Sequence, residues 1–225
     1  VEVEIVPLEQ VLQKATLDVQ GQLGSYDLYY LDQSWMATFA QDTVDPREYY
    51  AAKPDLAMPG FDWDDFSVPL LNGISMYDGK MVGIPFDIPI FIMMYRKDLL
   101  DKYGLRPPET MDEYMTAVKT INDGEKGNGI YGTTGQLKSG HYSLNCDWTA
   151  WLWSHGGSIF DETGMFSGGD ADGLAGLDYM LELVNYMPPA AKTWTWDGEG
   201  QSVAQGQAAM LISWGEFFPS YDGTN

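Results

Sequence analysis

Polar and aromatic side chains occur together at four places where the sequence predicts the end of a strand or the loop after it. Carboxylates and amides form paired hydrogen bonds with vicinal hydroxyl groups, and indole rings cover the apolar C–H faces of a sugar. None of the four places contains Lys or Arg, which disfavours an anionic ligand and leaves a neutral polyhydroxylated ligand or a cation. The candidate ligand-binding residues are Asp32, Gln33, Trp35, Asp87, Asn145, Asp147, Trp148, Trp214 and Glu216.

Asp87 is the charged residue inside the otherwise apolar stretch GIPFDIPIFIMMY, residues 83–95. A charge in an apolar strand costs free energy unless it is paired, hydrogen-bonded or close to water. A place at the end of the strand, facing a cleft, would remove that cost. Asp32 and Asp87 could instead be helix caps or turn formers, and any single Trp could belong to the core. The recurrence at four strand ends favours ligand binding.

The remaining reactive side chains do not form a pattern that predicts catalysis. Asp161 and Glu162 are adjacent, so their side chains point apart, and we interpret them as part of a turn and not as a glycosidase pair. His141, Cys146 and His155 lack the spacing of a metal site, and no nucleophile motif or phosphate loop occurs in the sequence. We expect no catalytic residue, no metal site and no cofactor.

Composition limits the possible partners. The 225 residues include 33 Asp and Glu against 12 Lys and Arg, a net charge of −21 that disfavours nucleic acid and anionic membrane surfaces. Cys146 is the single cysteine, so no disulfide can form within the chain. The longest apolar run, residues 84–95, is too short to cross a bilayer. The first residues resemble a strand already under way, so we expect a fragment that lacks its first elements and its C-terminal part.

The order of predicted elements indicates the α/β fold class. Alternating Val and Glu at residues 1–5 predict a strand, apolar residues at helical spacing from Val11 to Leu23 predict a helix, and residues 28–31 predict a second strand. This order is typical of a parallel α/β layer. The dipeptide Asp78-Gly79 predicts a hairpin with a type I′ turn, which leads into a strand at residues 83–95.

The second half of the chain repeats this mixture of helices and strands. Thr110 and Glu113 have the spacing of a capping box at the start of a helix. Other helices are expected at residues 97–103, at residues 148–155, and along the apolar stripe Leu174, Leu177, Leu181 and Val184. Strands are expected at residues 130–134 and 208–216.

Three sequence segments together resemble a known family. They are YDGKMVGIPFDIPIFIMMYRKDLLDKYGLRPPETMDEY, WLWSHGGSIFDETG and VAQGQAAMLISWGE, and with YDLYYLD near the start they cover nearly the whole chain. They resemble the extracellular (periplasmic) solute-binding proteins of sugar ABC transporters, in the maltose-binding-protein-like group. Val203 and Gln207 depart from that pattern, where Phe and Lys are usual.

The resemblance implies a two-lobed periplasmic-binding-protein fold of type II-like topology, present here in part. The N-terminal lobe would be residues 1–87, the hinge crossing residues 88–92 and the C-terminal lobe residues 93–225. Asp87 would then lie at the floor of the cleft. Asp32, Gln33 and Trp35 would come from one lobe, and the candidate residues from Asn145 onward would come from the other.

The resemblance also implies a function. The expected protein is a periplasmic or extracellular monomer. It would capture a neutral sugar, oligosaccharide or sugar alcohol and deliver it to the membrane subunits of an ABC permease. It would not be an enzyme. A cationic solute, such as a quaternary amine or polyamine, is the alternative ligand, because aromatic rings with carboxylates also form a cation cage. A carbohydrate-active enzyme and a purely structural or adhesive role are further alternatives.

Overall fold

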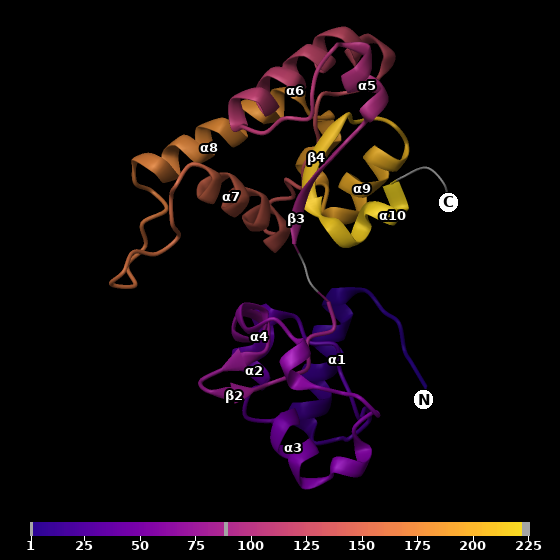
Figure 1. Cartoon of the computed structure of the whole chain (residues 1–225), viewed down its shortest axis with the longest axis vertical. Coiled ribbons are helices and arrows are strands. Elements are labelled where there is room, and N and C mark those ends of the chain that lie inside the picture. The colour runs from indigo at the N-terminus through magenta and orange to yellow at the C-terminus, as the bar shows by residue number, and fades with distance from the viewer. Residues whose placement is uncertain (1, 88–89, 222–225) are drawn as a thin grey trace. The chain divides into compact units, whose positions relative to one another are not determined.

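The computed structural model describes residues 2–87 and 90–221, which form two compact units, Val1–Ile88 and Pro89–Asn225 (Figure 1). We call them unit 1 and unit 2 and describe each by itself. The expected hinge crossing at residues 88–92 includes positions 88 and 89, which lie outside the described residues. Within the described ranges, no helix has both the length and the apolar character that crossing a membrane requires.

Unit 1 consists of short helices, turns and one hairpin. Its loop-rich part, residues 41–75, packs around a cluster of rings in which Phe61 and Trp63 meet edge to face with centroids 4.8 Å apart. Its helices are α1 (Leu8–Gly21), α2 (Met36–Phe39), α3 (Pro46–Ala52) and α4 (Val68–Ile74), its 3-10 turns are Gln33–Trp35, Pro54–Leu56 and Trp63–Asp65, and its strands are β1 (Met76–Tyr77) and β2 (Lys80–Met81).

The hairpin of unit 1 confirms the turn that the sequence predicts. Met76 pairs with Met81 and Tyr77 with Lys80 in antiparallel register. Asp78 has a φ of 49° and Gly79 a φ of 79°, so both central residues lie in the left-handed region that a type I′ turn requires.

The other strands predicted for unit 1 are absent from its described residues, and these predictions were wrong. Residues 2–7 and 28–31 are irregular, as are residues 82–87 at the start of the strand predicted for residues 83–95. Ile5 and Leu28 are 92% and 88% exposed. A strand needs a hydrogen-bonded neighbour as well as an alternating pattern, and these segments have no strand beside them.

Unit 2 is built on the antiparallel strands β3 (Phe91–Tyr95) and β4 (Met210–Trp214), paired from Phe91 with Trp214 to Tyr95 with Met210. The predicted strand at residues 130–134 is reduced to one parallel bridge between Tyr131 and Ala208. Helices surround the two strands in Figure 1. They are α5 (Lys97–Lys102), α6 (Met111–Glu125), α7 (Tyr142–Ser154), α8 (Ala171–Leu183), α9 (Trp196–Ala204) and α10 (Phe218–Tyr221), with 3-10 turns at Lys126–Asn128, Val184–Tyr186, Pro189–Thr193 and Gly215–Phe217.

Helices α5 and α6 follow the sequence predictions closely. Gly104, with a φ of 64°, ends the turn after α5, and Thr110 Oγ1 accepts a hydrogen bond from the Glu113 N–H at 3.2 Å. α6 buries Tyr114, Val118 and Ile121 among others, and these side chains pack with residues of α5, α7, α8 and β4 in one core. The buried carboxylate of Glu125 accepts from Tyr103 Oη and pairs with Lys102, which ties α5 to α6.

Helix α7 starts six residues earlier than predicted. His141 precedes its first turn, and His141 Nδ1 accepts a hydrogen bond from the Ser143 N–H at 3.2 Å. Ser, Thr, Asp and Asn are the usual capping residues, so this histidine cap was not expected from the sequence. Asn145 and Asp147 therefore lie inside a helix, and their predicted place at a strand end or in the loop after it was wrong, whereas Trp148 is helical as predicted.

Helix α8 forms where its leucine stripe predicts, but the stripe points outward. Leu174, Leu177 and Leu181 are exposed, whereas Met180 and Leu183 are buried with the glycines of the opposite face. At Gly176 a methyl group would lie 2.8 Å from the Trp151 carbonyl oxygen of α7. The absence of a side chain there allows the two helix backbones to approach closely.

Candidate functional site

The first group of predicted ligand-binding residues forms a turn in unit 1. Asp32 accepts hydrogen bonds from the Ser34 N–H at 2.9 Å and from Ser34 Oγ at 2.5 Å, so it caps the 3-10 turn Gln33–Trp35. Gln33 is exposed, and Asp32 and Trp35 are half-buried. Asp32 is thus a turn former, which was the alternative considered for it.

Asp87 is the last described residue of unit 1, and it is half-buried. The surrounding segment is not a buried strand, because Ile84, Phe86 and Ile90 are all exposed. The free-energy cost that would attach to a carboxylate in an apolar strand therefore does not arise. Asp87 therefore lies near the surface of unit 1 and not inside a buried strand.

The three predicted residues on α7 face different surroundings. Asn145 is exposed. Trp148 packs on the segment after α7, since a methyl group on Gly168 would lie 2.8 Å from Trp148 Cη2. Asp147 is buried: its Oδ2 accepts from the Gln136 N–H at 3.0 Å and its Oδ1 from Gln136 Nε2 at 2.9 Å. The helix does not bring these side chains onto one surface.

Trp214 lies at the centre of a group of rings in unit 2. Its ring meets Phe91 edge to face at a centroid distance of 4.8 Å and an angle of 90°. It meets Trp196 at 6.2 Å and 81°, and Phe217 at 6.4 Å and 82°. Glu216, also a candidate, is exposed in the turn directly after β4.

The cluster extends beyond Trp214 through Trp196. His141 and Tyr142 lie 5.0 and 5.6 Å from Trp196, centroid to centroid, and stack on each other at an angle of 23°. We call the set the aromatic wall; it consists of Phe91, His141, Tyr142, Trp196, Trp214 and Phe217. Phe91 begins β3 shortly after the boundary of the units, so the wall lies at the end of unit 2 where the chain enters it.

Sequence reasoning found Trp214 but missed its neighbours His141, Tyr142, Trp196 and Phe217. One signal was present in the segment TWTW, residues 193–196, where two tryptophans alternate. Trp194 packs against the core, and Trp196 joins the wall. In an extended chain these two residues would share one side, so their different surroundings reflect the start of α9 at Trp196.

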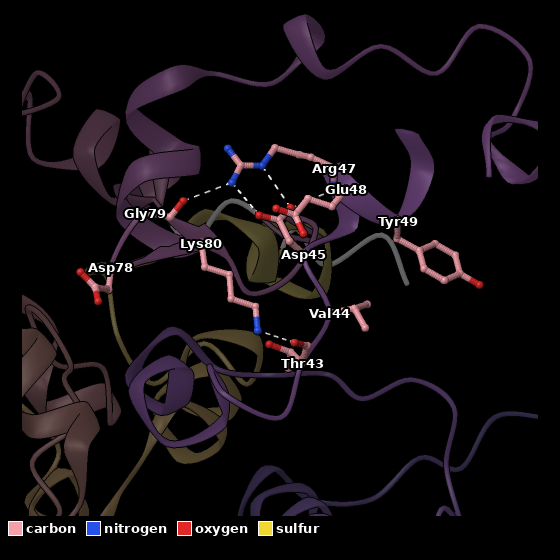
Figure 2. Close-up of a pocket in the computed structure, with 9 residues that line it drawn as sticks. All are labelled: Thr43, Val44, Asp45, Arg47, Glu48, Tyr49, Asp78, Gly79 and Lys80. Atoms are coloured by element: carbon pink, nitrogen blue, oxygen red, sulfur yellow. Dashed lines mark hydrogen bonds and ion pairs between the residues drawn. The ribbon is translucent and has the colours of Figure 1, made fainter. Parts of the chain in front are cut away.

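A cavity of about 710 Å³ lies elsewhere, in unit 1 (Figure 2). Asp45 caps α3, pairs with Arg47 and accepts from the Met81 N–H at 3.0 Å, which connects α3 to the hairpin. Lys80 Nζ donates to the Ala40 and Thr43 carbonyl oxygens. Asp45, Arg47 and Lys80 are thus engaged in contacts that hold the walls of the cavity together. Its lining residues are Thr43, Val44, Asp45, Arg47, Glu48, Tyr49, Asp78, Gly79 and Lys80.

Comparison with known proteins decides the family. A model of the bacterial extracellular solute-binding protein family matches residues 1–222. The chain belongs to this family. The resemblance inferred from the motifs around residues 77–114, 151–164 and 203–216 is thereby confirmed.

Similar proteins include one curated relative and two solved structures. A probable ABC transporter-binding protein of Deinococcus radiodurans is 28% identical over 204 residues, 87% of this chain and 46% of its own length. A solute-binding protein of Agrobacterium radiobacter K84, in complex with ribitol, is 28% identical with a TM-score of 0.85, over 98% of this chain and 54% of its own. Maltose-bound T. maritima MalE3 is 26% identical with a TM-score of 0.81, over 96% and 54%.

These similarities support the two-lobed binding-protein fold predicted from the sequence. The chain spans about half the length of the proteins that it matches. In such proteins the two α/β lobes close around a ligand by hinge motion. The family and the two structures are of solute-binding proteins and not of enzymes.

Proposed function

We propose that this chain captures a neutral sugar, oligosaccharide or sugar alcohol in the periplasm or outside the cell. It would deliver this ligand to the permease of an ABC transporter. The observation that carries the proposal is the aromatic wall at the end of unit 2 where the chain enters it. Flat rings cover the C–H faces of a carbohydrate. Ribitol and maltose in two similar proteins support this ligand class.

Polar candidates complete the proposed site. Asn145 and Glu216 are exposed in unit 2, and Asp87 is half-buried at the end of unit 1. Their amide and carboxylate groups can each form hydrogen bonds with ligand hydroxyls. A ligand that contacts both units would favour a closed arrangement, because only differential contact with two states shifts the equilibrium between them. The protein would act as a monomer without cofactor.

Catalysis is not part of this proposal. A glycosidase needs two carboxyl groups facing one bond. Asp147, one candidate acid, is buried and accepts two hydrogen bonds from Gln136. Asp32 is engaged in its own turn. The family assignment supports the same conclusion, since its members are solute-binding proteins.

A thermal-shift screen tests the ligand class. The full-length protein is mixed with ribitol, mannitol, maltose and raffinose, and separately with glycine betaine and spermidine. A ligand at a hundred times its Kd adds roughly 2.7 kcal/mol to the free energy of unfolding. We expect a saturable shift with a carbohydrate. A response to the cations alone would refute the carbohydrate proposal and favour a cation cage. Rings that meet near right angles, as Trp214 does with Phe91 and Trp196, are suited to such a cage.

The Trp214→Ala variant tests whether the aromatic wall is the ligand surface. We expect at least a tenfold loss of carbohydrate affinity, about 1.4 kcal/mol, by isothermal titration calorimetry. Trp153→Ala is the matched control, because Trp153 lies on α7 outside the wall and is 64% exposed. Equal affinities of the two variants would remove Trp214 from the site.

A further inference from the structure

Two acidic side chains lie buried within unit 2 on the elements that carry the aromatic wall. Asp147 of α7 is 5% exposed, and Glu199 of α9 is 0% exposed. Glu199 lies one helical turn after Trp196, the first residue of α9. Carboxyl groups are rarely buried so completely unless they are paired with a cation or protonated.

The hydrogen bonds of the two carboxyl groups differ. Both oxygens of Asp147 accept from Gln136, which suits an ionised carboxylate. Glu199 Oε2 accepts from Ser213 Oγ at 2.7 Å, whereas Glu199 Oε1 has no hydrogen-bond partner among the described residues. An ionised carboxylate with one buried oxygen unsatisfied is costly, so the neutral acid is the favoured form of Glu199.

The surroundings supply no positive charge. Within residues 2–87 and 90–221, neither acid forms an ion pair. The titratable groups that interact electrostatically with Glu199 are Asp147, Tyr114 of α6 and Tyr221 of α10. From β4 the contact is Ser213, a neutral hydroxyl. Burial, followed by the charge of Asp147, raises the pKa of Glu199 well above its ordinary value, and burial raises the pKa of Asp147 as well.

The elements that meet at these acids are those that carry the wall. α7 begins with Tyr142, α9 begins with Trp196, and Ser213 of β4 precedes Trp214. The segment before α7 also forms hydrogen bonds with Asp147 and with α9. Gln136 binds Asp147, and Thr134 Oγ1 accepts from Ser202 Oγ of α9 at 3.1 Å.

We propose that Glu199 keeps its proton at neutral pH, and that the neutral side chain positions the aromatic wall by holding α9 against β4 through Ser213. Loss of the proton leaves a buried negative charge with one unsatisfied oxygen, which separation of α9 from β4 relieves. Glu199 is a positioning residue, since it is not placed in contact with the ligand. The effect on affinity rests on the function proposed above; the effect on unit 2 does not.

The sign of the pH effect follows from the direction of the shifts. A group whose pKa is raised on folding contributes stability below its unfolded pKa and loses it as pH rises through the folded pKa. Tm, the near-ultraviolet circular dichroism of the wall and carbohydrate affinity should therefore all fall as pH rises from about 5, just above the unfolded pKa of a glutamate carboxyl, to about 9. We expect the affinity to fall roughly tenfold over this range.

The variant Glu199→Gln tests the proposal, because it keeps the shape of the side chain and an acceptor for Ser213 but cannot ionise. Unfolding, near-ultraviolet circular dichroism and affinity for maltose and ribitol are measured over the same pH range. Glu199→Gln should show a shallower pH dependence of all three than the wild type, because Asp147 is then the one buried acid of this pair that still titrates. Glu162→Gln, which changes an exposed acid of the same unit, is the control and should keep the wild-type profile.

Separate outcomes distinguish this inference from the proposed function. If neither sugar binds at any pH, the carbohydrate proposal fails, while the unfolding and circular dichroism profiles still decide whether the proton is present. A flat wild-type profile, or a Glu199→Gln profile with the wild-type slope, overturns the inference. If Glu199→Gln does not fold, the infrared band of a protonated carboxyl in the wild-type protein decides: its presence at neutral pH and loss at alkaline pH support the proton on Glu199, and its absence refutes it.

Discussion

Gly176→Ala should destabilise unit 2, although alanine is the better helix former. The new methyl group would lie 2.8 Å from the Trp151 carbonyl oxygen and 2.9 and 3.0 Å from Leu152 Cα and N. All three atoms belong to the backbone of α7, so no side-chain rotation can relieve the contact. α8 must therefore move away from α7 by a few tenths of an ångström or more.

The expected magnitude combines two opposing effects. Replacing glycine by alanine inside a helix gains about 1 kcal/mol in helix propensity. Overpacking at a close contact costs about 1–3 kcal/mol, and the rigid backbone contacts at Gly176 place it in the upper half of that range. The free energy of unfolding of unit 2 should fall by about 1–2 kcal/mol, the difference between the two.

Urea denaturation followed by tryptophan fluorescence measures this change. Gly73→Ala is the matched control, because Gly73 also lies in a helix, α4, and a methyl group there would meet nothing within 4 Å. We expect that variant to stabilise unit 1 by about 0.5–1 kcal/mol. If Gly176→Ala proved as stabilising as Gly73→Ala, the close approach of α7 and α8 would be refuted.

Two further variants test local contacts that the fold depends on. Thr110→Ala removes the N-cap of α6 and should lower the stability of unit 2 by about 1 kcal/mol in thermal or urea unfolding, whereas an unchanged midpoint would contradict a role for the cap. Asp45→Asn should destabilise unit 1 by about 1–3 kcal/mol at neutral pH, because Arg47 and the Met81 N–H hold the pKa of Asp45 well below its usual range. The stability that ionised Asp45 contributes is present above its unfolded pKa and is lost as pH falls. The difference in free energy of unfolding between variant and wild type should therefore narrow in acid. A constant difference from pH about 7 to about 2 would contradict a stabilising role for the Asp45 charge.

Local signals predicted those parts of the fold that depend on local geometry. The Asp78-Gly79 turn and the Thr110 cap each involve residues that are neighbours in sequence, and both formed as expected. The strands predicted at residues 1–5 and 28–31 did not form in the described part of these segments, because pairing depends on a partner strand that the alternating pattern cannot specify. The leucine stripe located α8 but did not identify its buried face, which packs closely on α7 at Gly176 while Leu174, Leu177 and Leu181 are exposed.

The candidate site shows the same limit. Trp214 was found because it ends a strand with strong apolar character. Trp196, which meets Trp214, and Tyr142, which meets Trp196, come from two different helices, and only packing reveals these contacts. The family was accessible from the sequence because its motifs are long and contiguous.

The pairing of β3 with β4 has a consequence for how unit 2 folds. The paired residues, such as Tyr95 and Met210, are separated by on the order of a hundred residues, so closing this loop carries a large entropy cost and contributes to a high contact order. Trp214, on the later strand, enters the wall only when that loop closes. A nascent or partly refolded chain in which β4 has not yet paired with β3 therefore has no complete aromatic wall. A ligand bound at the wall would stabilise only chains in which this pairing has formed.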